Sequence, residues 1–537
     1  MDSTSVSSTT MGILLNEATE RPFQTGLLTI SLTILGYISF RGLFRNGSNA
    51  DEETLSKRKY PLPPGPPRDF LIGILRHFPS SRIWEKFTEW QKLYGDVVHV
   101  ALPGISLVIL SSYELSQELL SKRTNVTGGR AAGYMVTDVM GLSWSLAFMQ
   151  PGPHHSNQRK MLRKAIGPAR VSSHDPRIEQ MTNDLMLKFF NFQGYIPTAV
   201  TNAVSKLIID LTYGEAVREE MGDELTDSNQ EIMHLAEYAL FNAWIVDFLH
   251  FLRFIPSWFP GANFKRIGDR SIKLSDYIRF APFKVIQELH KSGKLGHSIA
   301  TDLLGEFGPN EDTQDALAVL NTAGSDTTTA AICAFLHAML LFPAIADKVF
   351  DEIQRVTHGQ RLLHIKERGQ LPFTEAVWKE SMRWNPFIPL GVPHVSSQDE
   401  VIDGYWIPKG SMIGQNFGVM LMNPKIWGDP EVFRPERFLN KGDNATGQGP
   451  LNPIDVIFGY GIRICPGMYL ASRTGFHIAA TTASLFNILP LEGESRPDPS
   501  MVEYTDIAFR LPVKLHCRFV PRDERAVHLL KTMSLSK

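Results

Sequence analysis

The chain has 537 residues, of which 43% are hydrophobic and 20% charged, and its formal net charge is −2. This composition is typical of a globular protein and excludes a disordered or fibrous chain, while the near-neutral charge predicts no nucleic-acid partner. The three cysteines, Cys333, Cys465 and Cys517, lie far apart and form no Cys-x-x-Cys pair. Neither a disulfide scaffold nor a structural zinc site is therefore expected.

The beginning of the chain predicts a membrane anchor. Residues 22–40 contain no charged side chain, and their length approaches the roughly 20 residues that a bilayer-spanning helix needs. Arg41 and Arg45 follow directly, which places the bulk of the chain in the cytoplasm. We therefore expect a short lumenal tail at 1–21 and a transmembrane signal anchor at 22–40. The alternative is a buried hydrophobic helix; a cleaved signal peptide fits worse, because the preceding stretch has no basic start.

Residues 41–67 are predicted to form a linker that ends in a proline-rich hinge. The hinge, PLPPGPP at 61–67, has five prolines in seven residues, and such a run enforces extended backbone. Residues 84–95 show helical spacing of apolar side chains, and 96–112 show two β-rich runs around a Pro-Gly turn.

The rest of the chain predicts a mainly α protein with small β-sheets, of the α+β class. Most of 113–390 has helical patterns with short breaks, and 401–414 returns to hairpin signals. We expect one large domain over 68–520 and a C-terminal tail over 521–537.

The segment FGYGIRICPG, residues 458–467, places Cys465 among glycines. Pro466 precedes a helical run, so Cys465 lies just ahead of a helix N-terminus, where free N–H groups and the helix dipole favour a thiolate. No second cysteine or histidine stands at ligand spacing, so a metal bound here would bring its other ligands, as haem does. Arg463 is placed to pair with a haem propionate. The alternative is that Cys465 is a small buried hydrophobic residue.

Phe458, Gly461, Arg463, Cys465 and Gly467 match the pattern F-x-x-G-x-R-x-C-x-G. This pattern resembles the haem-ligand loop of the cytochrome P450 monooxygenases, in which a cysteine thiolate binds haem iron. The resemblance implies the cytochrome P450 fold behind an N-terminal transmembrane helix, and haem b with Cys465 as the axial iron ligand. It also implies that Phe458, Gly459 and Arg463 contact the cofactor. It is strongest with the membrane-anchored, microsomal type and with fungal members, which implies the endoplasmic reticulum membrane.

Residues 314–342 form a long apolar run whose middle departs from helix rules. Gly324 and the three threonines at 327–329 are poor helix formers. The Thr327 hydroxyl can bond back to the Ala323 carbonyl, which we expect to loosen the helix and open a groove beside Gly324. The sequence AGSDT resembles the oxygen-activating segment of the family, which implies that Thr327 and Asp326 are catalytic and deliver protons. A kinked core helix is the alternative.

Glu380 and Arg383 share one helix face at i,i+3 spacing. Alone, such a pair is usually a solvated surface ion pair. It resembles the E-x-x-R motif of the family, whose third member lies in a P-E-R-F segment, present here at 435–438. The resemblance implies a buried Glu380–Arg383–Arg437 cluster with a structural role.

Three further residues are implied to hold the haem propionates. His394 lies in the segment after E-x-x-R, and Arg159 matches the arginine of the family's W-x-x-x-R. His155 stands where the tryptophan of that motif is expected. An imidazole can donate the same hydrogen bond, so His155 is included as a cofactor contact.

The resemblance implies a monooxygenase that inserts one oxygen atom from O2 into a small apolar substrate. The chain has no G-x-G-x-x-G motif at a strand–helix junction and no P-loop. Electrons are therefore expected from NADPH through a separate NADPH–cytochrome reductase. Lys160, Arg163 and Lys164 are expected to help dock that acidic partner.

The apolar stretches 133–149 and 241–264 are expected to line the substrate pocket and its mouth, with core packing as the alternative. A membrane anchor suits a substrate that partitions into lipid, such as a terpenoid of fungal secondary metabolism. Two other functions stay open at this point. One is a fold relative that rearranges peroxides or dehydrates substrates without external electrons, and the other is a non-catalytic haem-binding protein.

Overall fold

The computed structural model describes residues 59–69, 72–79, 81–242, 244–439, 451–505 and 509–535. The predicted lumenal tail, the anchor at 22–40 and most of the linker lie outside these residues. The chain divides into two units, Met1–Leu62 and Pro63–Lys537, and the second is described below. Within the described ranges no single helix passes as a membrane span; Glu311–Leu341 and Pro343–Thr357 do so only as a pair bent by 111°.

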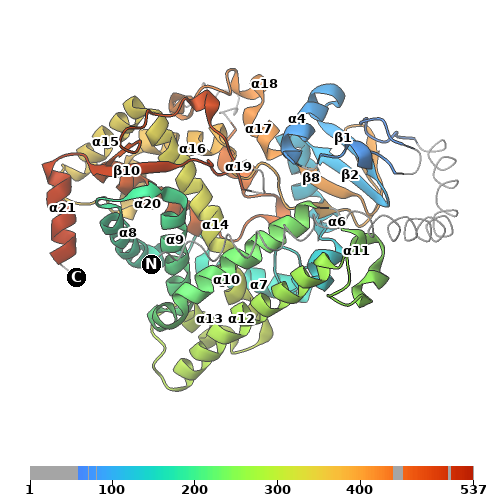
Figure 1. The fold of residues 1–537 in the computed structure, drawn as a ribbon, viewed down its shortest axis with the longest axis horizontal. Helices are drawn as coiled ribbons and strands as arrows, with labels where there is room; N and C mark the ends of the chain where they lie inside the picture. The colour runs from blue at the N-terminus through green and yellow to red at the C-terminus, as the bar shows by residue number, and fades with distance from the viewer. Residues whose placement is uncertain are drawn as a thin grey trace. The chain divides into compact units, whose positions relative to one another are not determined.

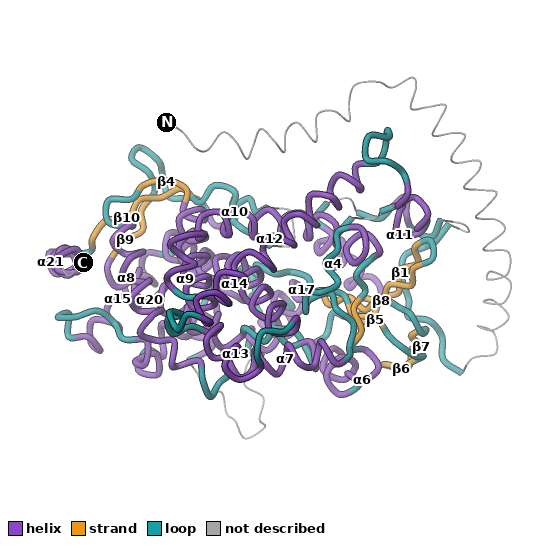
Figure 2. Tube along the Cα trace, turned by 90° about the horizontal axis from the view of Figure 1, so that it is seen from below, coloured by secondary structure: helices purple, strands orange, loops and turns teal. Residues whose placement is uncertain are grey.

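Helix α14 (Glu311–Leu341) is the central element (Figures 1 and 2). It begins at Asn310, whose side chain accepts a hydrogen bond from the Thr313 N–H at 3.0 Å, and its last twelve residues are all buried. A helix that is apolar all round must be covered on every side. The helices that pack against it are α7 (Pro153–Ile166), α9 (Ile196–Tyr213), α10 (Glu215–Phe241), α12 (Asn263–Lys291), α13 (Ile299–Phe307), α15 (Pro343–Thr357), α16 (Pro372–Trp384) and α20 (Met468–Leu485).

The remaining helices lie around this bundle. Helix α8 (Asp175–Phe189) packs on α9 and α20, and α4 (Ile83–Tyr94) packs on the first strand. The shorter α-helices are α5 (Tyr113–Ser116), α6 (Thr124–Thr127), α11 (Ile245–Phe248), α17 (Phe417–Met422), α18 (Pro424–Trp427) and α19 (Pro453–Ile457). The single-turn and π-helical pieces used below are η3 (Met135–Val139), η5 (His250–Phe254), η7 (Pro435–Phe438) and η8 (Gly461–Arg463).

Three small sheets complete the fold. The largest has the order β1-β2-β8-β5-β3, with β1 (Val97–Leu102), β2 (Ile105–Leu110), β8 (Met412–Gln415), β5 (His394–Val395) and β3 (Gly129–Arg130). The second has the order β4-β10-β9, with β4 (Gln193–Tyr195), β10 (His516–Pro521) and β9 (Phe486–Leu489), and the third is the hairpin of β6 (Glu400–Ile402) and β7 (Tyr405–Ile407). The prediction of a mainly helical fold with small sheets is confirmed.

Two strands and one helix lie where the sequence predicted them. The two β-rich runs of 96–112 form β1 and β2, which pair antiparallel from Val97↔Leu110 to Leu102↔Ile105. Gly104 turns the chain between them with a φ of +69°, which is the left-handed region that glycine enters without strain. The helix expected at 84–95 is α4, displaced by one residue.

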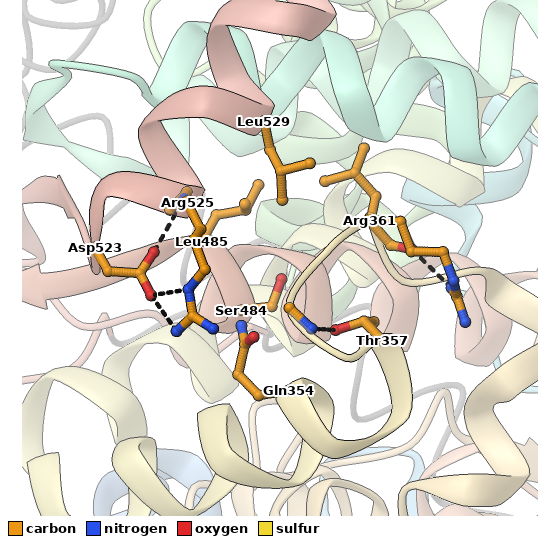
Figure 3. A pocket seen from close by; sticks show the side chains of 11 residues that line it. Gln354, Thr357, Arg361, Ser484, Leu485, Asp523, Arg525 and Leu529 are labelled. Carbon is orange, nitrogen blue, oxygen red and sulfur yellow. Dashed lines mark hydrogen bonds and ion pairs between the residues drawn. The ribbon is translucent and has the colours of Figure 1, made fainter.

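The predicted C-terminal tail contains an ordered helix. Helix α21 (Glu524–Leu535) packs on α8 and β10, and its Ala526 and Leu530 are buried. Figure 3 shows a pocket beside it, and none of the predicted site residues lines this pocket. The lining residues labelled there are Gln354, Thr357, Arg361, Ser484, Leu485, Asp523, Arg525 and Leu529.

Candidate active site

The cysteine loop is shaped by two glycines with positive φ, Gly459 at +77° and Gly461 at +57°. A Cβ atom on Gly461 would lie 2.3 Å from the Leu120 carbonyl oxygen, so no larger residue fits there. The loop closes where the Cys465 N–H donates to the Phe458 carbonyl at 2.7 Å, and α20 begins three residues after Cys465. Gly467 differs, because its φ of −82° is open to any residue and its Cβ would meet only Cys465 Sγ at 3.7 Å.

Burial raises the pKa of the Cys465 thiol above its ordinary value, while hydrogen bonds from the Gly467 and Met468 N–H groups and the charge of Arg159 lower it. The N–H groups at the helix N-terminus therefore favour a thiolate as expected, and desolvation acts against them. A bound metal cation would reverse this balance, since a coordinating thiol loses its proton to the metal.

Two arginines at the cysteine loop donate hydrogen bonds to backbone carbonyls. The buried Arg463 donates to the carbonyls of Gly128 at 2.7 Å, Leu146 at 3.2 Å and Met149 at 2.7 Å. Arg159 Nη1, from α7, donates to the Ile464 carbonyl at 2.9 Å. Burial and the charge of Arg159 lower the pKa of Arg463 to about 10.

A third arginine, Arg130, joins them and was missed by the sequence analysis. It lies on β3 opposite His394 of β5, and its Nη1 donates to the Val392 carbonyl at 2.6 Å. Its Nε is buried without a hydrogen-bond partner. Burial and the charges of Arg463 and Arg159 lower the pKa of Arg130 to about 9. No motif marks this residue, and its only signal in the sequence is a lone arginine between glycines and alanines.

Two neutral histidines complete the group. His155 is 3% exposed, and its Nε2 has no hydrogen-bond partner among the described residues. Burial and the charges of Arg463, Arg159 and Arg130 lower the pKa of His155 to about 4. Burial and Arg130 lower the pKa of His394 to about 3, while its Nδ1 lies 2.8 Å from the Thr127 carbonyl. Both rings are thus uncharged near neutral pH and can donate from one nitrogen.

We call Arg130, His155, Arg159, His394 and Arg463 the cationic cradle. None of its three arginines forms an ion pair with a carboxylate in the part of the chain that the structure describes. Arg463 is buried, and Arg130 and Arg159 are half-buried. Cations withdrawn from water without counter-charges are costly, and unpartnered buried donors call for an acceptor. The cradle is therefore suited to an anionic group seated next to Cys465.

On α14 the Thr327 hydroxyl donates to the Ala323 carbonyl at 3.1 Å. The helix nevertheless runs unbroken from Glu311 to Leu341, so the expected loosening is absent. The groove expected beside Gly324 is also wrong, because Ile208 of α9 would lie 3.2 Å from a Cβ at that position. Glycine here lets α9 and α14 approach closely.

Asp326 lies within the interface of α14 with α10. Burial raises the pKa of its carboxyl, and the charge of His234 on α10 partly opposes this shift. A raised pKa keeps the proton on this carboxyl to a higher pH than on an ordinary aspartate, which suits a group that passes protons on. Asp326 directly precedes Thr327 in the sequence, so both catalytic candidates lie on the same turn of α14.

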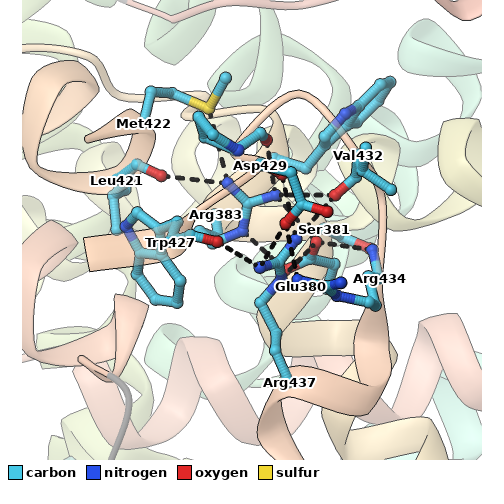
Figure 4. A network of polar contacts seen from close by, with 12 residues as sticks. Glu380, Ser381, Arg383, Leu421, Met422, Trp427, Asp429, Val432, Arg434 and Arg437 are labelled. Carbon is cyan, nitrogen blue, oxygen red and sulfur yellow. Dashed lines mark hydrogen bonds and ion pairs between the residues drawn. The ribbon is translucent and has the colours of Figure 1, made fainter. Parts of the chain in front are cut away.

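Glu380, Arg383 and Arg437 form a separate ion cluster (Figure 4). Glu380 and Arg383 have 0% side-chain exposure and make two hydrogen bonds, of 2.7 and 2.8 Å. Arg437 Nε, from η7, donates to the same carboxylate at 3.2 Å, and the Arg434 N–H donates at 2.8 Å. The cluster joins α16 to η7 and contains no free donor site, which fits a structural role.

The two apolar stretches that were expected to line the substrate pocket differ in burial. Met135, Val136 and Met140 of 133–149 are buried in the main core. In contrast, 241–264 carries α11 and η5, with exposed Ile245, Phe248, Phe251, Phe254 and Trp258.

The basic residues of α7 that were expected to dock the reductase are all exposed: Lys160, Arg163 and Lys164. Lys164 pairs with Glu306, and both lysines lie over the Phe307 ring.

Comparison with known proteins decides the family. The sequence matches the Cytochrome P450 family model over residues 63–512. The chain belongs to the cytochrome P450 family. The tryptamine 4-monooxygenase of Psilocybe cyanescens is 30% identical over 521 residues, which cover 95% of this P450 and 99% of that relative.

Two more fungal relatives show the same extent of similarity. The cytochrome P450 monooxygenase 98 of Postia placenta is 30% identical over 491 residues, covering 89% of this P450 and 94% of the relative. The cytochrome P450 monooxygenase COX2 of Coprinopsis cinerea is 31% identical over 480 residues, covering 87% and 90%. This P450 is thus a member of the monooxygenases, a family in which a cysteine thiolate holds haem iron.

The residues present fit such a cofactor. Haem carries two propionate carboxylates. In the residues that the structure describes, the three arginines of the cationic cradle have no carboxylate partner and His155 Nε2 has no hydrogen-bond partner. Cys465 stands beside this cradle, since Arg159 both contacts Ile464 and interacts with the Cys465 sulfur. Charge and hydrogen-bonding capacity therefore match the ligand set that the family requires.

Proposed function

We propose that this P450 binds haem b with Cys465 as the axial iron ligand and inserts one oxygen atom from O2 into a small apolar substrate. The observation that carries the proposal is the cationic cradle next to Cys465. Among the described residues its arginines have no carboxylate partner and His155 Nε2 has no hydrogen-bond partner, which suits the two propionates. Arg130, Arg159, Arg463, His155 and His394 would hold these carboxylates. Bound haem supplies the binding and reductive activation of dioxygen.

The chain supplies groups that can pass on protons. Thr327 offers a hydroxyl that is anchored to the Ala323 carbonyl, and the neighbouring Asp326 carboxyl has a raised pKa. Together they can hold and transfer the protons that the reduction of oxygen to water consumes. Phe458 and Gly459 shape the loop that presents Cys465.

Spectroscopy of the reduced protein with carbon monoxide tests the ligand. We expect the red-shifted Soret band of thiolate-ligated haem, and we expect Cys465→Ala to abolish it. Cys517→Ala is the matched control, because Cys517 is a buried cysteine on β10 that lies outside the site. Retention of the band in Cys465→Ala would remove the central assignment.

The electron donor is proposed to be NADPH through a separate reductase in the same membrane. Lys160 and Arg163 are exposed on α7, the helix that carries Arg159, and would meet acidic groups of that partner. Reversing both charges should raise the apparent KM for reductase, whereas Lys291→Glu on α12 should not. An unchanged KM would exclude this docking surface.

Product formed without NADPH or reductase would instead favour a donor-independent rearrangement or dehydration.

The location and substrate class form a further part of the proposal. Residues 22–40 would anchor the chain in the endoplasmic reticulum membrane, with the catalytic domain in the cytoplasm. The exposed apolar side chains of α11 and η5 support contact with lipid, and a lipid-soluble substrate such as a terpenoid of secondary metabolism fits this setting. Deletion of residues 1–40 should shift the protein out of the membrane pellet, and an unchanged distribution would exclude the anchor.

A further inference from the structure

A polar strip runs through the otherwise apolar interface of α10 and α14. Asn229 Oδ1 on α10 accepts from Asn321 Nδ2 at 3.5 Å and from Thr322 Oγ1 at 3.4 Å on α14. About one turn further along α14 lies Asp326, and about two turns further along α10 lies Glu237. The half-buried Asp326 and the buried Glu237 therefore lie on the two helices of one interface, and the charge of Asp326 acts on Glu237.

Glu237 is a buried acid that lacks a proper partner. Its side chain is 8% exposed, and its Oε1 has no hydrogen-bond partner in the described ranges. Burial and the charge of Asp326 raise the pKa of the Glu237 carboxyl to about 8. It is therefore largely protonated at neutral pH, which is the state that a proton donor needs. A perturbed, unsatisfied carboxyl of this kind is expected at a functional site more than in a passive core.

His234 connects Glu237 to solvent. Its Nδ1 lies 3.9 Å from Glu237 Oε2, one turn away on the same helix. The imidazole is 63% exposed, and its charge also acts on Asp326. The three side chains thus form a series that starts at the surface and ends beside Thr327.

We propose that His234 and Glu237 form a path that carries protons from solvent to Asp326. When the Asp326 carboxyl gives its proton to the site, its carboxylate takes one from the Glu237 carboxyl. Glu237 then takes a proton from the His234 imidazolium, and His234 takes one from water, so every group returns to its starting state. The path rests on the proposed monooxygenase function, which consumes two protons and two electrons for each oxygen molecule.

Glu237→Gln tests the buried step, because glutamine keeps the shape of the side chain and cannot pass on a proton. We expect kcat to fall about tenfold with little change in KM, since general acid–base groups contribute about 10²–10⁴ and water can bypass part of the path. We also expect a larger solvent deuterium isotope effect, more hydrogen peroxide per NADPH, and partial rescue in Glu237→Asp. Glu220→Gln, an exposed glutamate on the same helix, should match the wild type.

Infrared difference spectroscopy gives a measurement that does not depend on turnover. Wild-type holoprotein minus Glu237→Gln at pH 7 should show the carbonyl stretch of one protonated carboxylic acid, and its absence would overturn the proposal. Wild-type coupling and isotope effect in Glu237→Gln would also overturn it.

His234→Asn, a surface change that spares the fold, should slow turnover about threefold and raise the isotope effect. Wild-type kinetics in this variant would exclude the solvent end of the path. Every variant should keep the carbon monoxide band of the wild type. Loss of that band in the wild type itself would refute the proposed function and not this inference.

Discussion

Glu380→Gln should destabilise the fold far more than the loss of an ordinary ion pair. The Glu380 carboxylate accepts four hydrogen bonds, from Arg383 Nε and Nη2, Arg437 Nε and the Arg434 N–H, at 2.7 to 3.2 Å. Glutamine keeps one acceptor but removes the charge that both arginine side chains face. Breaking a buried pair on one side costs about 3–5 kcal/mol, because the remaining charge is left without compensation.

The expected change in melting temperature follows from the size of the domain. An unfolding entropy of about 2.1 cal/mol/K per residue gives about 1 kcal/mol/K for the unit Pro63–Lys537. A loss of about 3 kcal/mol should therefore lower Tm by about 3 °C. Thermal unfolding of the holoprotein, followed by circular dichroism, measures this shift. The fraction that remains folded should keep the thiolate carbon monoxide band, because the cluster touches none of the cradle residues.

Two comparisons make the prediction refutable. Glu89→Gln removes an exposed pair with Lys86, 2.7 Å long, and should change stability by less than about 1 kcal/mol. The double variant Glu380→Met, Arg383→Met should lose about 2 kcal/mol less than the sum of the single changes, since the second change removes the uncompensated charge. A Tm for Glu380→Gln within about 1 °C of the wild type, or strict additivity, would show that the cluster is not held by charge compensation.

Three more variants test the site at separate points. Gly461→Ala should lower the free energy of unfolding by at least about 1–3 kcal/mol, because the position has a positive φ and the new Cβ would meet the Leu120 carbonyl. Gly467→Ala should be nearly neutral in thermal unfolding. Equal effects of the two changes would contradict the loop geometry. Thr327→Ala should keep haem but divert NADPH electrons to hydrogen peroxide, and unchanged coupling would mean that Thr327 is structural. His337 has its pKa lowered from 6.5 to about 4 by burial, so the unfolded chain binds the proton first as the pH falls. The contribution of uncharged His337 to the free energy of unfolding should be fully present above pH 6.5 and decline by up to about 1.4 kcal/mol per pH unit down to pH 4. Denaturant midpoints measured against pH should decline less steeply in His337→Gln than in the wild type. Equal slopes in the two proteins would refute this.

Local patterns were readable from the sequence because they depend on neighbouring residues. The turn at Gly104, the helix at 83–94 and the glycine-shaped cysteine loop follow from backbone preferences and apolar spacing. Arg130 escaped notice because its partners, Val392 and Arg463, lie more than 250 residues away. No spacing rule reaches across such a separation.

The two wrong expectations have a common physical origin. The loosened helix at Thr327 and the groove at Gly324 were both inferred from the local backbone. In the fold, α14 runs unbroken through Thr327, and Ile208 of α9 fills the space beside Gly324. Packing is set by distant segments, so it appears only once the tertiary structure is known.

Buried arginines are treated in two different ways in this protein, and the difference separates structure from function. Arg383 and Arg437 are paired with the Glu380 and Asp429 carboxylates and bonded to backbone carbonyls, so their cluster is complete within the chain. Arg130 and Arg463 have carbonyls but no carboxylate in the described part of the chain, and the charge of Arg463 lowers the pKa of Arg130. Such repulsion destabilises the fold unless a negatively charged group from outside the chain compensates it. An anionic cofactor beside Cys465 would do so, and binding it would then stabilise the fold as well as equip it for chemistry.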